Sequence, residues 1–296
     1  MTVVDSRPGP GAGSGRGPAR VVGVIGRAGR GLGGLGVSGL LAAVAVLVMV
    51  VAVVRPHWLA SGDPTAIDPR AAFTAPGAAH WFGTDESGRD VYTRVVHGAG
   101  RSLGIGVAAT GIGVGIGLVL GLAGGLGPRW LDAAVSRVVE VLFALPTLVL
   151  ALLLVAVRGP GIGPSVLAVG LATAPGYARI LRARVRGVAA SGYVDAARLE
   201  GRSPVGVLRG HVLPNTLWPL ASVATLGVGQ AVVWVCALSF LGLGALPPLP
   251  EWGAMLNAGR VYLPTAWWIT VFPGLAITAT AAALTVLGRR LGRVHG

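Results

Sequence analysis

Lysine is absent from this sequence of 296 residues, cysteine occurs once, at Cys236, and charged residues make up only 12% of the chain. Soluble globular domains carry about 25% charged residues, so the composition is not that of an ordinary water-soluble protein. The single cysteine excludes a disulfide within the chain. Hydrophobic residues make up 53% of the sequence, and its mean hydropathy is +0.73. This composition favours helices that lie in a lipid bilayer.

Long stretches without ionisable side chains predict where these helices cross the bilayer. A helix needs about 20 apolar residues to span about 30 Å of hydrocarbon. The first 35 residues are rich in glycine, proline, alanine and arginine, which predicts a flexible cytoplasmic tail. We therefore expect an all-α polytopic membrane protein, with this tail over 1–35 and a transmembrane domain over 36–296. The predicted spans lie near 36–54, 103–126, 138–157, 162–178, 217–241 and 267–288.

Arginine is distributed unevenly between the two sides of these spans. If the N-terminus is cytoplasmic, 17 of the 24 arginines fall in inside segments and seven in outside segments. Cytoplasmic segments of membrane proteins carry an excess of basic residues, so both termini are predicted to be cytoplasmic. The inside arginines are split over four segments and are not interleaved with a series of aromatic residues, which argues against nucleic-acid binding.

Gly31 to Gly36 match the spacing GxGxxG of dinucleotide-binding turns. No strand is predicted before these glycines, and they lead into a membrane span instead of a βαβ unit, so we interpret the match as accidental. The sequence also lacks the GxxxxGK[ST] loop that binds nucleotide phosphates. We therefore expect that this chain binds no cofactor and hydrolyses no ATP.

Glu140 is the only acidic residue inside a predicted span, and it follows Arg137 by one helical turn. An i, i+3 ion pair at the membrane surface explains its presence. Proton-coupled carriers generally need carboxylates or histidines at membrane depth, and the five histidines fall in loops or at span edges. The spans also lack catalytic or metal-binding patterns such as HExxH. The sequence thus argues against an ion-coupled carrier, an intramembrane enzyme and a metal site.

Glycine recurs every four residues along the second predicted span, at Gly113, Gly117, Gly121 and Gly125. This spacing places the glycines on one helix face, where the backbone of another helix could approach closely. We expect helix packing there, within this chain or with a partner, in preference to a substrate groove.

The longest inside loop predicts two short helices joined by a turn. Gly201 suits the left-handed conformation that ends a helix, Ser203 is a good N-cap, and Pro204 suits the first position of a helix. Pro214 is expected to limit the second helix.

Such a helical hairpin has the shape of a docking element that projects from the membrane. Val205, Leu208 and Val212 are predicted to fall on one face, and Ala196 and Ala197 leave room for another surface to approach closely. The alternative is a solvated amphipathic loop that its arginines hold to anionic lipid.

An outside segment before the second predicted span reads HWFGTDESGRD over residues 80–90. Thr84 or Asp85 could cap a helix that starts at Glu86, and Arg89 would then lie one turn after Asp85 on the same face. A structural role and a role in gating or partner contact remain open for this segment.

These segments resemble the permease subunits of binding-protein-dependent ABC importers, in the dipeptide, oligopeptide and nickel branch. The family's cytoplasmic loop carries EAA, three residues, glycine and, after a gap, an apolar residue, x, leucine and proline; here Asp195 replaces the glutamate. The segment 80–90 resembles the branch's H-x-FGTDxxGRD. The matches follow in chain order: Gly83, Thr84, Asp85, Gly88, Arg89 and Asp90, Phe143 to Pro146, Tyr177 to Arg179, Asp195, Ala196, Ala197, Gly201, Leu213 and Pro214, Phe240 to Gly244, Pro247 to Gly253, and Phe272 to Gly274.

The resemblance implies the type I ABC importer permease fold, with six transmembrane helices and a cytoplasmic hairpin that couples to an ATPase. It implies a complex in the bacterial plasma membrane of two homologous permeases, two ABC ATPase subunits that bind ATP and Mg²⁺, and an extracytoplasmic solute-binding protein. Thr285, Arg289 and Arg290 depart from the family's usual C-terminal pattern of asparagine and acidic residues. The implied coupling loop comprises Tyr193, Asp195, Ala196, Ala197, Gly201, Ser203, Pro204, His211, Leu213 and Pro214.

For such a permease the resemblance implies di- or oligopeptides as the substrate. Nickel or another small solute is the alternative within the same family. The alternative of another class is a membrane scaffold protein whose inside loop binds lipid and which transports nothing.

Overall fold

The computed structural model describes residues 37–217 and 219–295. The chain divides into two units, Met1–Val37 and Ser38–Gly296, and the following account concerns the second. The predicted tail over 1–35 and the GxGxxG spacing at 31–36 lie outside the described residues. The described part of the chain is helical, which confirms the predicted all-α class, and its only β-feature is an isolated bridge between Thr84 and Asp90.

Helices occupy all six positions where spans are predicted, and shorter helices lie between them. The α-helices of the described ranges are α1 (Val37–Val54), α2 (Val91–Leu126), α3 (Arg129–Phe143), α4 (Thr147–Arg158), α5 (Ile162–Ala189), α6 (Gly192–Leu199), α7 (Pro204–Val207), α8 (Leu213–Leu217), α9 (Leu220–Phe240), α10 (Trp252–Gly259) and α11 (Trp268–His295). Single turns of 3₁₀-helix lie at Pro56–Trp58, Pro69–Ala71 and Arg260–Tyr262, and a π-helical segment lies at Leu208–Val212.

Length and apolar composition identify three helices that could cross a membrane, namely α2, α9 and α11. The pair α3 and α4 adds a fourth if the two helices form one broken span. α1 is shorter, with its apolar stretch over Gly39–Val54, and α5 continues past its apolar part into a segment that carries four arginines. Three or four of the six predicted spans therefore meet the requirements of a membrane-spanning helix by themselves.

The third predicted span, 138–157, is wrong as a single helix. α3 ends at Phe143, α4 begins at Thr147, and the two helices are bent by 90°. Pro146 explains the break, because proline has no amide hydrogen to donate and holds the preceding residue out of the helical conformation.

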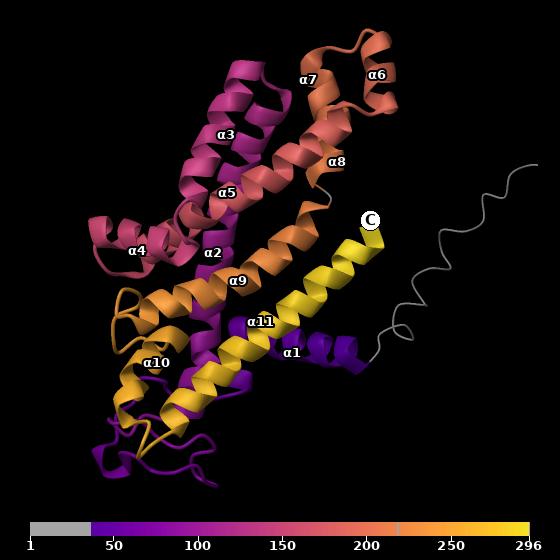
Figure 1. Cartoon of the computed structure of the whole chain (residues 1–296). Coiled ribbons are helices and arrows are strands. Elements are labelled where there is room, and N and C mark those ends of the chain that lie inside the picture. The colour runs from indigo at the N-terminus through magenta and orange to yellow at the C-terminus, as the bar shows by residue number, and fades with distance from the viewer. Residues whose placement is uncertain (1–36, 218, 296) are drawn as a thin grey trace, which may run out of the picture. The chain divides into compact units, whose positions relative to one another are not determined.

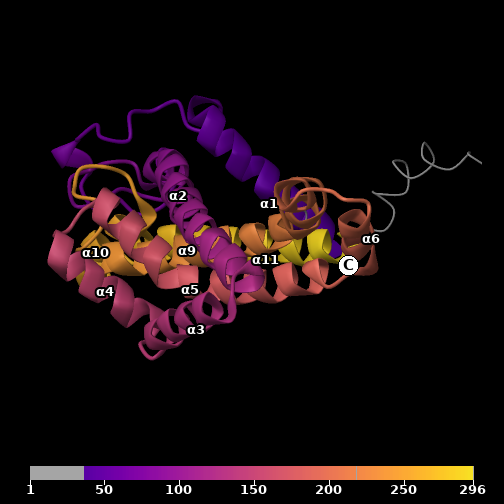
Figure 2. The ribbon, with the colours of Figure 1, turned by 90° about the horizontal axis from the view of Figure 1, so that it is seen from above.

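The long helices pack against one another, and α2 contacts most of them. α2 lies against α5 and crosses α9, and α9 runs beside α11 (Figure 1). The view from above also shows α2 crossing the other long helices (Figure 2). One buried cluster includes Val95 of α2 and Trp252 of α10, and a second joins α4, α5 and α9 through Val155, Val169 and Leu238. In a bilayer such contacts hold helices together by close packing.

Candidate functional site

The inside loop folds as a helical hairpin of α6 and α7, with its turn at Gly201. The Gly201 residue has a φ of +80°, and its amide donates to the Arg198 carbonyl (3.0 Å). The next amide, of Arg202, donates to the Ala197 carbonyl (3.3 Å). These two bonds form a Schellman motif, whose left-handed position favours glycine. The conformation predicted for Gly201 is therefore the one observed.

The second helix of the hairpin begins as predicted but does not end as predicted. The Ser203 hydroxyl accepts a hydrogen bond from the Gly206 amide (3.2 Å), and Pro204 takes the first position of α7. Beyond α7 the chain continues through the π-helical segment into α8, so Pro214 does not limit this helix. Proline is tolerated there because it lies in the first turn of α8, where the chain enters from the wider π-turn.

Small apolar side chains attach the hairpin to the end of α5. The buried cluster comprises Val185 and Val188 of α5 together with Val194, Ala197, Val207 and Val212. The face predicted from Val205 is wrong, because Val205 is 56% exposed and Val207 is buried instead. The π-helical segment explains the change, since its i, i+5 spacing aligns Val207 with Val212. Ala196 is exposed, whereas Ala197 is buried.

The other side of the hairpin is exposed and partly apolar. Leu199 is 89% exposed, and the Tyr193 side chain is also exposed. Asp195 forms an ion pair with Arg198 (3.1 Å) on the surface of α6. The Tyr193 ring stacks on the His211 ring, with 6.4 Å between the ring centroids, and this contact connects α6 to the π-helical segment. A firmly attached hairpin with exposed apolar side chains is suited to docking another protein.

The outside segment over 80–90 folds as a compact loop that leads into α2. Asp85 Oδ1 accepts hydrogen bonds from the amides of Ser87 and Arg89 (2.9 Å each), and its Oδ2 accepts one from Arg89 Nε (2.7 Å). Gly88 closes this turn with a φ of +75°, and a side chain there would overlap the Asp68 carbonyl. The Asp85 and Arg89 pair is therefore part of a loop, not of a helix surface.

The helix cap predicted at Thr84 or Asp85 is wrong, because no helix starts at Glu86. Asp90 caps α2 instead and accepts a hydrogen bond from the Thr93 amide (2.7 Å). Aspartate side chains close turns as readily as they cap helices, and the turn bonds of Asp85 prevail here. Asp90 also contacts the ring nitrogen Nδ1 of His80 (2.8 Å).

Two buried contacts tie this loop to the rest of the protein. The Thr84 side chain is fully buried, and its hydroxyl accepts a hydrogen bond from the Thr74 amide (2.8 Å). The carbonyl oxygen of Thr84 accepts one from Trp268 Nε1 at the start of α11 (3.0 Å). Within the loop itself, the Gly83 amide donates to the His80 carbonyl (2.9 Å). The loop is thus anchored to the first turn of a long helix.

Arg94 is a buried residue whose role the sequence did not reveal. Its Nη1 donates to the carbonyl of Pro64 (2.9 Å) and reaches the carbonyl of Pro248 (3.4 Å), and its Nε lies 3.6 Å from Asp85 Oδ2. Arg94 therefore joins three segments of the outer loops. An arginine near the start of a span is common, so the sequence carried no signal for this contact.

Glu251 is a second buried charge that the sequence did not single out. Its carboxylate caps α10 by accepting hydrogen bonds from the amides of Gly253 (2.9 Å) and Ala254 (2.8 Å). It also accepts a bond from the Ser102 hydroxyl of α2 (3.3 Å), and the Cys236 thiol of α9 lies at 3.4 Å. The signal available was an isolated acid in a long uncharged stretch, directly before Trp252.

The glycine stripe of α2 faces α5. A Cβ at Gly113 would lie 2.7 Å from Thr173 Oγ1, and one at Gly117 would lie 2.5 Å from Tyr177 Cβ. At Gly121 and Gly125 the nearest side chains would be those of Leu181 and Val185. The glycines are therefore where α2 and α5 approach each other within this chain.

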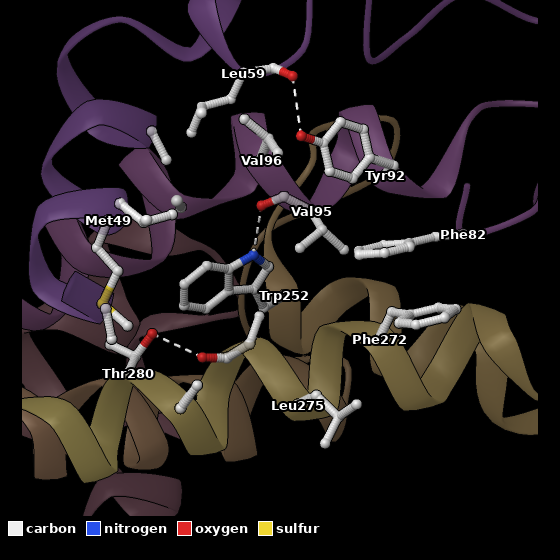
Figure 3. Close-up of a pocket in the computed structure, with 16 residues that line it drawn as sticks. Met49, Leu59, Phe82, Tyr92, Val95, Val96, Trp252, Phe272, Leu275 and Thr280 are labelled. Carbon is white, nitrogen blue, oxygen red and sulfur yellow. Dashed lines mark hydrogen bonds between the residues drawn. The ribbon is translucent and has the colours of Figure 1, made fainter. Parts of the chain in front are cut away.

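An apolar cavity of about 540 Å³ lies between α1, α2, α10 and α11 (Figure 3). The polar groups on its wall are occupied by internal hydrogen bonds. Trp252 Nε1 donates to the Val95 carbonyl (2.8 Å), and the Tyr92 hydroxyl donates to the Leu59 carbonyl (2.9 Å). The Thr280 hydroxyl likewise donates within α11. Such a wall suits apolar groups and not a polar solute.

The two predicted groups of residues lie at opposite ends of α2: the loop over 80–90 leads into its start, and the hairpin packs near its other end (Figure 1). Among the described residues, no group of three or more histidine, cysteine, aspartate or glutamate side chains is placed to hold a metal ion. The contacts observed in both groups are those of packing and charge pairing.

This architecture, long apolar helices with a packed helical hairpin at one end, is that of a polytopic membrane protein. Residues 113–295 match the family of binding-protein-dependent transport system inner membrane components. The chain belongs to this family.

The relatives in this family are named as permeases of peptide transport. The chain is 36% identical to the dipeptide transport system permease protein DppC of Alkalihalophilus pseudofirmus, over 78% of this chain and 76% of that protein. It is 40% identical to the probable D,D-dipeptide transport system permease protein DdpC of Escherichia coli, over 78% of each. It is also 38% identical to the glutathione transport system permease protein GsiD of Pectobacterium atrosepticum, over 72% of this chain and 71% of that protein.

Two solved structures share the fold. A chain of the MetNI methionine ABC transporter in an inward-facing conformation superposes with a TM-score of 0.57 at 19% identity, over 69% of this chain and 96% of that one. A chain of an amino acid ABC transporter with histidines gives a TM-score of 0.55 at 17% identity, over 68% and 94%. The chain thus has the fold of ABC importer membrane subunits.

Proposed function

We propose that this permease forms half of the path by which di- or oligopeptides enter a bacterial cell, together with a second homologous permease. Two ABC ATPase subunits drive the cycle, and an extracytoplasmic binding protein delivers the substrate. The names of the relatives support peptides as the substrate class, because they include dipeptide and D,D-dipeptide permeases.

The hairpin of α6 and α7 is the observation that carries the coupling role. Its buried side is fixed to the end of α5 through Val185 and Val188, and its other side exposes Leu199. A partner that binds the exposed side can therefore move α5 together with the hairpin, because the hairpin packs directly against the end of α5. Closure of the ATPase dimer around ATP would then switch the helix bundle between inward and outward access.

The proposed topology places both termini and the hairpin in the cytoplasm and the loop over 80–90 outside. The excess of arginine in the inside segments supports this orientation. The six helical positions supply the six spans of the proposal, with α3 and α4 together as the third. Cysteine labelling from either side of the membrane, at Trp81 outside and at Arg202 inside, tests this orientation directly.

Purification of the tagged chain from its own membranes tests the assembly. The proposal predicts that an ABC ATPase and a second permease copurify with the chain. The purified complex in proteoliposomes should then take up labelled dipeptides when ATP is supplied. Uptake that stops when an ion gradient is collapsed while ATP remains would contradict the proposal. A scaffold would bring down no ATPase, and a nickel permease would take up Ni²⁺ in place of peptides.

A further inference from the structure

Two arginines of α5 bind one carboxylate of α3. Arg182 Nη2 forms an ion pair with Asp132 Oδ1, and Arg186 Nη2 forms one with Asp132 Oδ2. The Asp132 and Arg182 side chains are about three-quarters buried, at 23% and 25% exposed. Arg186 Nη2 also donates to the Gly124 carbonyl near the end of α2 (3.3 Å). The cluster therefore joins α2, α3 and α5.

The position of Asp132 makes this contact specific. Asp132 lies in the first turn of α3, where the helix dipole stabilises a negative charge. Below it, Val135 and Val139 of α3 pack in one cluster with Ala178 of α5. The other acid of α3, Glu140, pairs with Arg137 of its own helix (3.5 Å) and with no other basic residue of the described ranges, and both of those side chains are mostly exposed. Only Asp132 of these two acids connects α3 to a different helix.

The segment of α5 that Asp132 binds is also the segment that carries the hairpin. Val185 lies between Arg182 and Arg186 in sequence and, with Val188, forms the base on which the hairpin packs. Arg182 and Arg186 are one helical turn apart, so without a shared carboxylate their charges would repel each other and weaken this turn. The Asp132 carboxylate removes that repulsion and fixes the turn to α3.

We propose that Asp132 is a positioning residue for energy coupling, which fastens the hairpin-bearing end of α5 to α2 and α3 through Arg182 and Arg186. Movement of the hairpin is then passed to three helices together. Without this carboxylate, the end of α5 moves with the hairpin and the rest of the bundle follows less completely. The inference rests on the proposed function, because it assumes that the hairpin is driven by an ATPase.

The first test compares Asp132→Asn with Glu140→Gln in the purified complex, reconstituted in proteoliposomes. Both substitutions remove one negative charge from α3 at nearly constant size. We expect Asp132→Asn to lower the peptide taken up per ATP hydrolysed about fivefold, the change that about 1 kcal/mol gives, and Glu140→Gln to leave it unchanged. Asp132→Glu, which restores the charge, should recover part of the ratio.

The same measurement separates failure of this inference from failure of the proposed function. If the unmodified complex shows no ATP-driven uptake, the proposed function fails. If that complex transports and Asp132→Asn transports with the same ratio, the role of Asp132 is overturned. An equal loss in Glu140→Gln would also overturn it, since the effect would then be one of charge on α3 in general.

A second test reads the position of the hairpin without using transport. Spin labels at Trp130 on α3 and Arg202 on the hairpin, both exposed, report their distance in the complex when Cys236 is replaced by serine. We expect a broader distance distribution with Arg186→Gln, which removes one of the two ion pairs of Asp132. The Arg186 side chain is about half exposed, so this substitution is milder than Asp132→Asn and can be used if that variant does not assemble. An unchanged distribution in Arg186→Gln overturns the inference, whether or not Asp132→Asn assembles.

Discussion

Ala197 and Leu199 lie two residues apart in α6 and face opposite surroundings, because Ala197 is 3% exposed and Leu199 is 89% exposed. The small side chain is used to attach the hairpin to α5, and the large one is presented outward. Leu199 therefore buries little apolar surface within the described chain. Under the proposed function, we expect this side chain to contact the ATPase.

We predict that Leu199→Asp weakens the association of the ATPase subunits about tenfold, the change that 1.4 kcal/mol gives. The thermal stability of the isolated chain should stay unchanged, because Leu199 is exposed in it. Titration of the detergent-solubilised permease with purified ATPase measures the affinity. Leu246→Asp, at an exposed leucine of the outer loop that leads to α10, is the matched control and should have no effect.

Gly201 offers a separate test of hairpin rigidity. No atom lies within 4 Å of a Cβ placed on Gly201, so a side chain there meets backbone strain and not a steric clash. The left-handed conformation costs a residue such as valine about 1–2 kcal/mol, whereas asparagine tolerates it. We expect Gly201→Val to remain in the membrane but to hydrolyse ATP without transport, and Gly201→Asn to remain close to normal. Normal peptide uptake by Gly201→Val would contradict the lever mechanism.

Local sequence signals predicted the hairpin turn well and long-range contacts poorly. The conformation of Gly201 and the cap at Ser203 depend on a few neighbouring residues, so residue type alone identified them. The exposed position of Val205 was missed because a π-helical segment changed the helical period after it. The pairing of Asp132 with Arg182 joins residues 50 positions apart in the chain. One sequence carries no local signal for such a contact.

The third predicted span shows where a local signal was present and was outweighed. Pro146 indicates a break, but the uncharged run over 141–157 is long enough to predict one span. The resemblance to the permease family supplied the role of the hairpin, which the physical pattern alone left open between a docking element and a lipid-bound loop.

The glycine stripe allows a matched comparison within one helix. A Cβ at Gly117 would lie 2.5 Å from Tyr177 Cβ of α5, whereas no atom lies within 4 Å of a Cβ at Gly115. We expect Gly117→Ala to lower the free energy of unfolding by about 1–3 kcal/mol through overpacking. Gly115→Ala should be neutral or slightly stabilising, because alanine favours a helix more than glycine does. Thermal unfolding of both variants in detergent measures the difference, and equal stability would show that α2 and α5 do not meet along this face.

The outer loop depends on the carboxylate of Asp85. Its side chain is 5% exposed and binds Arg89 Nε at 2.7 Å, and Arg94 Nε lies at 3.6 Å. Asp85→Asn keeps the size of the side chain but removes the charge that faces two buried guanidinium groups. Arg89 keeps its pair with Glu86 (2.6 Å), so we expect a loss of about 1.5–3 kcal/mol in the free energy of unfolding.

Asp63 provides the control for this substitution. It is an exposed aspartate of the same outer region, and hydrogen bonds from the Thr65 hydroxyl and amide lower the pKa of its carboxyl. Asp63→Asn removes the same charge without leaving a buried partner, so its effect on unfolding should be small. Proteolysis of the loop over 80–90 should become faster in Asp85→Asn and not in Asp63→Asn. Equal protection in the two variants would mean that packing at Thr84 and Trp268, not the buried charge, holds the loop in place.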